Sequence, residues 1–250
     1  MVDAFFADCL GPEGMSSRVA DHSVDVILTD LPYGLSECRW DTPLDLDALW
    51  REYDRALKPF GTVVLFAQQP FTSRLVSSNY DMFKYSLVWQ KSRPGAFAQA
   101  PYRFLCAHED ILVFSRAGTA KNARHRMTYN PQGTVPCHRI EAGKKGRTSH
   151  REGRATQADY VQTRTNYPRS VLAFANEARV AHPTQKPLAL LEYLVSTFSN
   201  EGDLIMDSCM GSGTTGVAAK RLGRRFIGFE NDAAIFALAQ SRLAQNERVE

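Results

Sequence analysis

The chain has 250 residues, of which 44% are hydrophobic and 23% charged, with a formal net charge of +3, enough for one sizeable α/β domain carrying an insertion. No apolar run approaches the ~20 residues of a membrane span. The N-terminus also lacks the basic segment of a secretion signal, so we expect a soluble cytoplasmic protein. The five cysteines are widely spaced without a Cys-x-x-Cys pair, and the six histidines do not complete a set of metal ligands. Both observations favour reduced thiols and no metal site.

The apolar pattern from position 24 onward alternates between strand and helix. The β-branched residues 24–29 predict a buried strand, which stops at a turn marked by the Pro and Gly of Asp30-Leu31-Pro32-Tyr33-Gly34. Apolar residues at helical spacing predict a helix over 44–57, which ends at Lys58-Pro59-Phe60-Gly61. Residues 62–67 then form a second predicted buried strand.

Two more strands are predicted before the apolar pattern is lost. A helix should follow Pro70, and the apolar runs at 85–89 and 110–114 have the length and composition of strands. The connection between these two strands holds three basic residues among aromatic ones: Lys91, Arg93 and Arg103.

Residues 117–169 form a basic insertion without apolar periodicity. They hold eleven Lys and Arg against three acidic residues, so this segment carries +8 and leaves −5 for the remainder. A basic segment on an acidic body indicates a polyanionic partner, and its low hydrophobicity favours partial disorder before that partner binds. A solvated basic loop without a partner is the alternative.

The strand and helix pattern resumes after the insertion. A helix begins at Pro187, and a strand at 204–206 runs through a glycine-rich turn into a helix that opens at 217–219. Another strand at 225–229 precedes a closing helix at 233–243.

This alternation predicts the α/β class with a doubly wound, mostly parallel sheet. We assign residues 1–116 and 170–250 to one domain and residues 117–169 to the insertion.

The glycine-rich turn has the spacing Gly-x-Gly-x-x-Gly at Gly211, Gly213 and Gly216. Glycine has no Cβ, so backbone amides at the start of the following helix can approach a ligand closely. The strand 225–229 ends on Glu230, where an acidic side chain can meet the two hydroxyls of a ribose. The unit therefore indicates a nucleoside-cofactor site, with a purely structural turn as the alternative.

Two predicted strands, 24–29 and 204–206, each end in an aspartate followed by a turn. If they are neighbours, Asp30 and Asp207 flank one crevice at the carboxyl edge of the sheet, where open α/β sheets bind ligands. The Asp30 carboxylate and the Leu31 carbonyl are two acceptors beside the Tyr33 ring, which suits the exocyclic amine of a flat base. The alternative is a type I turn in which Tyr33 is an ordinary core aromatic.

Together these motifs resemble the permuted (beta-group) amino DNA methyltransferases, in which the catalytic tetrapeptide precedes the cofactor loop. Residues 29–34, Thr-Asp-Leu-Pro-Tyr-Gly, are similar to the family's Asp-Pro-Pro-Tyr-Gly turn. Residues 207–215, Asp-Ser-Cys-Met-Gly-Ser-Gly-Thr-Thr, are similar to its Asp-Pro-Phe-x-Gly-Ser-Gly-Thr-Thr loop. Residues 182–187 match its His-Pro-Thr-Gln-Lys-Pro segment. Further stretches that fall in family order are Ala7-Asp8-Cys9-Leu10, Arg103 with residues 108–114, and residues 167–172.

The resemblance implies a Rossmann-like, S-adenosylmethionine-dependent methyltransferase fold with a mixed, mostly parallel seven-stranded sheet. It implies catalytic roles for Asp30, Leu31, Pro32 and Tyr33. It also implies a set of residues that bind S-adenosylmethionine: Asp8, Cys9, Thr184, Lys186, Asp207, Cys209, Gly211, Gly213, Thr214, and Glu230 at the ribose hydroxyls. For Lys186 an exposed position at the helix start is the alternative.

Two positions depart from the family pattern. Leu31 replaces the usual proline, but this position contributes a backbone carbonyl, so the acceptor survives. Ser208-Cys209 replaces the usual Pro-Phe and removes an aromatic that would line the cofactor pocket. We expect weaker cofactor binding and no loss of a group that the chemistry needs.

The resemblance implies methyl transfer to the exocyclic amine of a base flipped out of DNA. We predict adenine N6, because Asp heads the tetrapeptide whereas Ser is commoner in cytosine-N4 members; a cytosine-N4 enzyme and a catalytically decayed DNA-binding subunit are the alternatives. A dinucleotide oxidoreductase is disfavoured, since the 34 residues after Gly216 leave no room for a second mononucleotide half. The absence of Gly-Lys-Ser/Thr excludes a P-loop NTPase.

Double-stranded DNA is the expected partner, and the basic insertion is the expected target-recognition region. Its candidate DNA-binding residues are Arg124, Arg126, Arg139, Lys144, Lys145 and Arg147. A homodimer and a cognate restriction endonuclease are candidate protein partners, and no membrane contact is expected.

Overall fold

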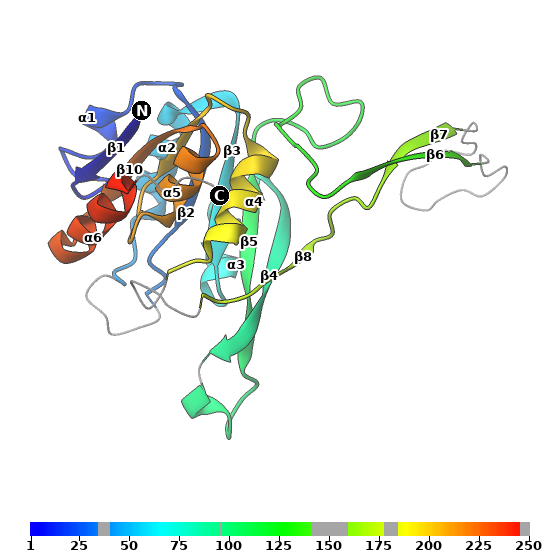
Figure 1. Ribbon diagram of the computed structural model, residues 1–250. Helices are drawn as coiled ribbons and strands as arrows, with labels where there is room; N and C mark the ends of the chain where they lie inside the picture. The colour runs from blue at the N-terminus through cyan, green and yellow to red at the C-terminus, as the bar shows by residue number, and fades with distance from the viewer. Residues whose placement is uncertain (35–40, 96, 142–159, 178–184, 246–250) are drawn as a thin grey trace. The chain divides into compact units, whose positions relative to one another are not determined.

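The computed structural model is an α/β fold, in which the described residues form an eight-stranded sheet and a two-stranded sheet (Figure 1). It describes residues 1–34, 41–95, 97–141, 160–177 and 185–245. The chain divides into a larger unit, Met1–Asn130 with Ser170–Glu250, and a smaller unit, Pro131–Arg169. The elements in chain order are β1 (Val2–Phe6), α1 (Met15–Arg18), β2 (Val24–Asp30), α2 (Leu46–Ala56), β3 (Leu57–Ala67), α3 (Phe71–Ser78), β4 (Phe83–Gly95), the 3-10 helix η1 (Phe97–Gln99), β5 (Cys106–Phe114), β6 (Val135–Glu141), β7 (Tyr160–Thr165), β8 (Val171–Phe174), α4 (Leu188–Phe198), β9 (Leu204–Asp207), α5 (Thr214–Arg221), β10 (Arg225–Glu230) and α6 (Ala233–Ala244).

The larger sheet has the strand order β1-β10-β9-β2-β3-β5-β4-β8. All neighbouring pairs are parallel except the two that contain β5. The predicted doubly wound, mostly parallel sheet is therefore confirmed, with eight described strands instead of seven. Within this sheet, the apolar periodicity did not identify β1 and β8, which are its two edges. Edge strands bury less of their surface, so their sequences carry a weaker apolar signal.

The alternation of side chains along the central strands divides the core into two layers. Ile27 of β2 faces a cluster that includes α2 and α3, whereas Val26 and Leu28 face a cluster that includes α4, α5 and α6. On β3, Val63 and Val64 repeat this division. Because successive residues of a strand point to opposite faces, continuous apolar runs such as these predict a sheet covered on both sides.

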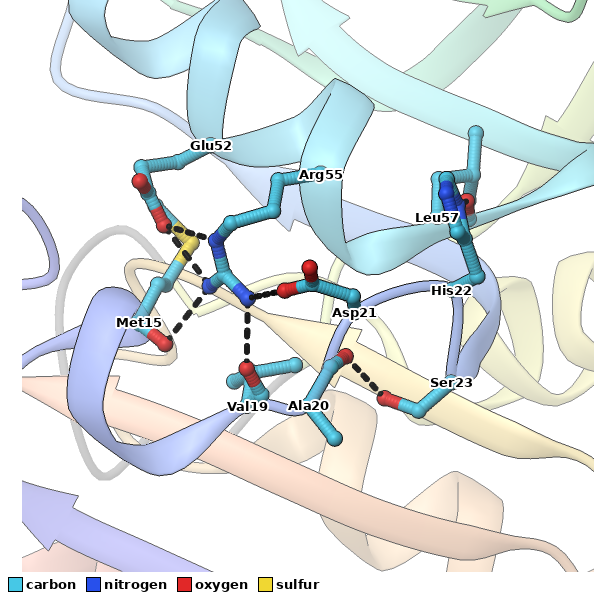
Figure 2. A network of polar contacts seen from close by, with 9 residues as sticks. All are labelled: Met15, Val19, Ala20, Asp21, His22, Ser23, Glu52, Arg55 and Leu57. Atoms are coloured by element: carbon cyan, nitrogen blue, oxygen red, sulfur yellow. Dashed lines mark hydrogen bonds and ion pairs between the residues drawn. The ribbon is translucent and has the colours of Figure 1, made fainter.

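Helix α2 also secures the chain that enters β2. Arg55 donates to the carbonyls of Met15 and Val19 at 2.9 and 2.7 Å and to Asp21 Oδ1 at 2.6 Å (Figure 2). Within its own helix it pairs with Glu52 Oε2 at 2.8 Å. One guanidinium therefore ties α1, the loop that leads to β2, and α2 together.

Residues 117–130 belong to the larger unit, although the sequence offered no apolar period there. Met127 is buried in the same core layer as α4. Asn130 Nδ2 donates to the Ser199 carbonyl at 2.9 Å, and His125 stacks on Phe60 with ring centroids 4.1 Å apart. Isolated contacts of this kind leave no periodic signature.

In the smaller unit, β6 and β7 pair antiparallel (Figure 1). Arg164 Nε donates to Thr134 Oγ1 at 2.9 Å near the base of this hairpin. Val135, Ile140 and Val161 are largely exposed, so the described residues of the hairpin do not form a core of their own. Residues 142–159, which join the two strands, lie outside the described residues. Throughout the described parts of the chain, no helix has both the length and the apolar character to cross a membrane.

Candidate active site

The turn that begins at Asp30 lies at the carboxyl end of β2, directly beside β9. Ile27 pairs with Met206 in a parallel register, so the two strands are neighbours, as expected. After β9 the chain continues to β10 on one side of this pair, and after β2 it continues to β3 on the other side. Their carboxyl ends therefore form a topological switch point, the usual ligand position in such sheets.

Both carboxylate oxygens of Asp30 have partners in the described structure. The Tyr33 hydroxyl donates to Oδ1 at 2.6 Å, and Lys186 Nζ lies 2.7 Å from Oδ2. The Tyr33 ring stacks on Phe71 with centroids 5.3 Å apart, and the Leu31 side chain is buried in the core. The turn is thus rigidly held, while a carboxylate oxygen with one partner can still accept a second donor.

Lys186 connects the turn at Asp30 to another carboxylate, the buried Glu109. Its Nζ lies 2.9 Å from Glu109 Oε2, and Lys91 Nζ lies 2.5 Å from Glu109 Oε1. The Lys186 side chain is only 10% exposed, so the alternative of an exposed lysine at the helix start is wrong. We call Lys91, Glu109, Lys186 and Asp30 the charge cluster; it alternates two cations with two anions.

The pKa values within the charge cluster reflect burial opposed by charge. Burial raises the pKa of Asp30, and the attraction of Lys186 offsets part of that rise. Burial also acts to raise the pKa of Glu109, but the two lysines outweigh it and lower that pKa. Burial acts to lower the pKa of Lys186, but Asp30 and Glu109 raise it to about 12. Lys186 therefore stays protonated and favours the charged form of Asp30.

The backbone around Lys186 is anchored at the start of α4. Glu177 Oε1 accepts a hydrogen bond from Leu188 N at 2.8 Å, and Glu177 Oε2 accepts one from Gln185 Nε2 at 2.5 Å. A carboxylate at a helix N-terminus satisfies a free amide and complements the helix dipole. Glu177 therefore fixes residues on both sides of Lys186 in the sequence, Gln185 and Leu188.

The glycine-rich loop between β9 and α5 contains two left-handed residues. Gly211 has φ +51° and Gly213 has φ +77°, conformations that strain any residue with a Cβ. At Gly216 a Cβ would lie 2.7 Å from both Leu243 and Phe226, so this glycine serves the packing of α5 on α6 and β10. Arg242 of α6 holds the loop from outside, donating to the Ser212 carbonyl at 2.6 Å.

Glu230 at the end of β10 is joined to the same loop. Its Oε2 accepts from Gly211 N at 3.0 Å and its Oε1 accepts from Asp232 N at 2.8 Å. Burial raises the pKa of this carboxyl, and the backbone donors offset part of the rise. The Asn231 amide is a further backbone donor to this carboxylate, so the backbone fixes Glu230 at the wall of the cavity.

The two residues that depart from the family pattern have local partners. The Ser208 and Tyr53 hydroxyl oxygens lie 2.6 Å apart in a buried pair, a contact that proline could not make. A hydrogen bond with Cys9, together with burial, raises the pKa of the Cys209 thiol well above its usual range. Cys209 therefore presents a neutral thiol to the site.

A cavity of about 530 Å³ joins the turn at Asp30 and the glycine-rich loop, within the size range of small-molecule sites. Twelve of the predicted catalytic and cofactor residues line it: Asp8, Cys9, Asp30, Leu31, Pro32, Tyr33, Lys186, Asp207, Cys209, Gly211, Thr214 and Glu230. Gly213 instead caps the start of α5, where a Cβ would lie 3.2 Å from Ala239. Thr184 lies outside the described residues.

The predicted DNA-binding residues fall in three places. Arg124 and Arg126 are exposed residues of the larger unit, and Arg139 is exposed on β6 in the smaller unit. The remaining three, Lys144, Lys145 and Arg147, lie outside the described residues.

The sequence did not identify two charged residues that line the cavity, Glu109 and Lys91, as part of the site. Glu109 belongs to the stretch 108–114 that falls in family order, and it precedes an apolar strand. An acidic residue that continues a buried strand needs a cationic or hydrogen-bonding partner, and this need was the signal available in the sequence. The partner could not be identified, because Lys186 is distant in sequence.

Comparison with known proteins gives a consistent result. A family model described as DNA methylase (N6_N4_Mtase) matches residues 24–241. The type II methyltransferase M2.DpnII of Streptococcus pneumoniae is 30% identical over 258 residues, covering 92% of this chain and 87% of the relative. The type II methyltransferase M.HpaI of Haemophilus parainfluenzae is 28% identical over 238 residues, covering 90% and 70%.

Solved structures share the fold at lower identity. The M1.HpyAVI–SAM complex superposes with a TM-score of 0.65 at 24% identity, covering 98% of this chain and all (100%) of that one. The cytosine-N4-specific PvuII DNA methyltransferase superposes with a TM-score of 0.66 at 17% identity, covering 99% and 88%.

Proposed function

The chain belongs to the N6/N4 DNA methylase family, and from this premise we propose that it transfers a methyl group from S-adenosylmethionine to the exocyclic N6 of an adenine flipped out of DNA. The observation that carries the proposal is the position of Asp30. Its carboxylate lines the same cavity as the glycine-rich loop and Glu230, and a buried lysine lies 2.7 Å from it.

Adenine is favoured over cytosine because an aspartate heads the tetrapeptide, as in the adenine-N6 members that the chain resembles. Methylation of cytosine N4 is the second candidate, and the structural similarity to a cytosine-N4 enzyme keeps it open. At 17% identity that similarity concerns the fold alone. The two products have different masses, so they are separable by digestion and mass spectrometry.

The residues around the cavity fit S-adenosylmethionine. Gly211 and its neighbours present backbone at the end of a strand, and the Glu230 carboxylate stands where ribose hydroxyls can donate to it. Asp8, Cys9 and Cys209 line the adenine end in this proposal, while Asp207 and Thr214 shape the methionine end. When bound, the cofactor supplies an electrophilic methyl group and leaves as a neutral thioether.

In the proposed reaction, Asp30 and the Leu31 carbonyl accept the two amine hydrogens of the flipped base. This directs the nitrogen lone pair out of conjugation and toward the methyl carbon. The new N–C bond forms as the C–S bond breaks, and the displaced amine proton leaves through Asp30. Tyr33 stacks on the base and offsets part of the unstacking cost, with Pro32 holding the turn. Positioning and electrostatics supply the acceleration.

Lys186 has a supporting role in this scheme. Because Asp30 is partly buried, its charged form is costly, and the ammonium group of Lys186 lowers that cost. Glu109 and Lys91 hold Lys186 in place and complete the charge balance. This arrangement disfavours a decayed DNA-binding subunit, which has no need for a costly buried charge cluster.

Residues 117–169 are proposed as the target-recognition region. Arg124, Arg126 and Arg139 are exposed, as phosphate-binding side chains must be. Lys144, Lys145 and Arg147 are assigned the same task from sequence alone. We further propose a cytoplasmic location, with a homodimer and a cognate restriction endonuclease as candidate protein partners.

A transfer assay tests the proposal. The protein is incubated with S-[methyl-³H]adenosylmethionine and mixed-sequence duplex DNA, and the DNA is digested to nucleosides. We expect label in N6-methyladenine and none with Asp30→Ala. Label in N4-methylcytosine contradicts the choice of base, and unlabelled DNA contradicts the activity.

A further inference from the structure

The tip of the β4–β5 hairpin carries exposed side chains that the proposed reaction does not use. Lys91 lines the cavity, but every described residue from 92 to 104 is exposed. Three of these residues are aromatic, with exposed fractions of 79% for Phe97, 88% for Tyr102 and 101% for Phe104. Large aromatic side chains gathered in this way indicate an interaction surface.

The hairpin tip has an ordered backbone. It contains the short 3-10 helix η1, and Ala100 N donates to the Phe97 carbonyl at 3.0 Å. The amides of Tyr102 and Arg103 both donate to the Gln99 carbonyl, at 2.9 and 3.0 Å. The aromatic side chains therefore project from a defined turn, so less ordering entropy is lost on binding.

The tip lies on the catalytic edge of the sheet. β5 is antiparallel to both β3 and β4, so β4 runs in the same direction as β2 and β3. Its carboxyl end therefore points to the edge where Asp30 lies, and Figure 1 shows the hairpin extending well past the neighbouring strands. A duplex that delivers a base to Asp30 must approach this edge.

The charge of the tip matches a polyanion. Residues 91–108 contain no Asp or Glu, and Arg93 and Arg103 are exposed among the aromatic residues. Two copies of such a tip would place like charges together, whereas DNA phosphates complement them.

We infer that the hairpin tip is a second DNA-contacting element, in which Arg93 and Arg103 bind phosphates and the aromatic side chains stack on bases left exposed beside the flipped nucleotide. The inference rests on the proposed function, because withdrawing a base leaves two unstacked neighbours. DNA-binding proteins fill such gaps with apolar or aromatic side chains.

The test compares an intact mixed-sequence duplex with the same duplex carrying one abasic site, which mimics the gap left by a flipped base. We expect the wild type to bind the abasic duplex about tenfold more tightly, in line with base–aromatic stacking. The triple variant Phe97→Ala/Tyr102→Ala/Phe104→Ala should lose this preference. Tyr80→Ala is the matched control, since Tyr80 is 73% exposed and precedes β4 at the opposite edge.

A second variant separates charge from stacking. Arg93→Ala/Arg103→Ala should weaken binding to both duplexes and reduce the slope of log K against log salt by about 2, while the abasic preference remains. Cofactor affinity, measured by calorimetry, should stay unchanged in all variants.

Several results overturn the inference. They are a wild type that does not distinguish the two duplexes, a triple variant that keeps the preference, and a dimer that the triple variant dissociates without change in DNA affinity. A wild type that shows the preference but transfers no methyl group contradicts the proposed function alone.

Discussion

The neighbouring strands β2 and β9 each end on an aspartate, and the chain surrounds the two carboxylates in opposite ways. The Asp30 side chain is 27% exposed, whereas Asp207 is buried. Asp30 faces a cation, Lys186 Nζ at 2.7 Å, whereas Asp207 has neutral donors: Cys209 N at 3.2 Å and the hydroxyls of Thr29 and Thr215. Burial raises the pKa of Asp207 to about 6, and hydrogen bonds only partly oppose it. In the proposed function the two carboxylates differ accordingly: Lys186 favours the charged form of Asp30, whereas Asp207 is fixed by neutral hydrogen bonds beside the glycine-rich loop.

Removing the Asp30 carboxylate should have the largest effect. Asp30→Ala is expected to reduce kcat for methylation by about 10²–10³-fold or more, since an acceptor that acts in the transition state is lost. Binding of S-adenosylmethionine, measured by calorimetry, should stay within about twofold because the glycine-rich loop is untouched. Asp30→Asn is the matched control that keeps shape without charge, and it should be nearly as inactive. Full activity in either variant refutes the catalytic role.

The comparison predicts that Lys186 acts on Asp30 through its charge. Lys186→Met leaves the Asp30 carboxylate without its cation and leaves Glu109 with Lys91 alone, so unfolding in denaturant should show a loss of about 3–5 kcal/mol. The remaining folded enzyme should have an acid limb of the kcat–pH profile shifted to higher pH. The sign follows because Lys186 lowers the pKa of Asp30, so its removal lets Asp30 protonate at higher pH.

The variant Glu109→Gln should move the acid limb of the kcat–pH profile in the opposite direction. Glu109 acts to raise the pKa of Asp30, so its neutralisation should shift the acid limb to lower pH. Lys186→Arg, which keeps the charge, should leave the limb near its wild-type position. Shifts in the same direction for Lys186→Met and Glu109→Gln mean that the charge cluster does not set the pKa of Asp30.

On the cofactor side, Glu230→Ala should raise the Kd for S-adenosylmethionine by about 10–100-fold, because charge-assisted hydrogen bonds to the ribose are lost. At saturating cofactor, kcat should fall little. Calorimetry and initial rates separate the two quantities, and an unchanged Kd refutes the ribose role.

The smallest effect concerns the replacement of the family's Pro-Phe by Ser208-Cys209. Ser208→Ala removes the partner of the buried Tyr53 hydroxyl and should cost about 1–2 kcal/mol of unfolding free energy. Tyr53→Phe should cost about the same, and the double variant little more, since both remove one hydrogen bond. Additive losses in this cycle contradict the pairing.

Much of this architecture could be predicted where one strand or helix carries its own signal. The continuous apolar runs of β2 and β3 and the helical spacing in α2 identified the core, and the two aspartates marked the site edge. The β6–β7 hairpin escaped prediction because it lies largely exposed, without an apolar face. The charge cluster escaped because Glu109 and Lys186 meet only after the sheet forms, and no local pattern encodes that contact.

The most direct test of the central claim is sequencing with modified-base detection on unmethylated DNA treated with the protein and S-adenosylmethionine, with the Asp30→Ala variant in parallel. The account predicts N6-methyladenine at one recurring sequence with the wild type and none with the variant. N4-methylcytosine at the recurring site, or equal modification by both proteins, would contradict it.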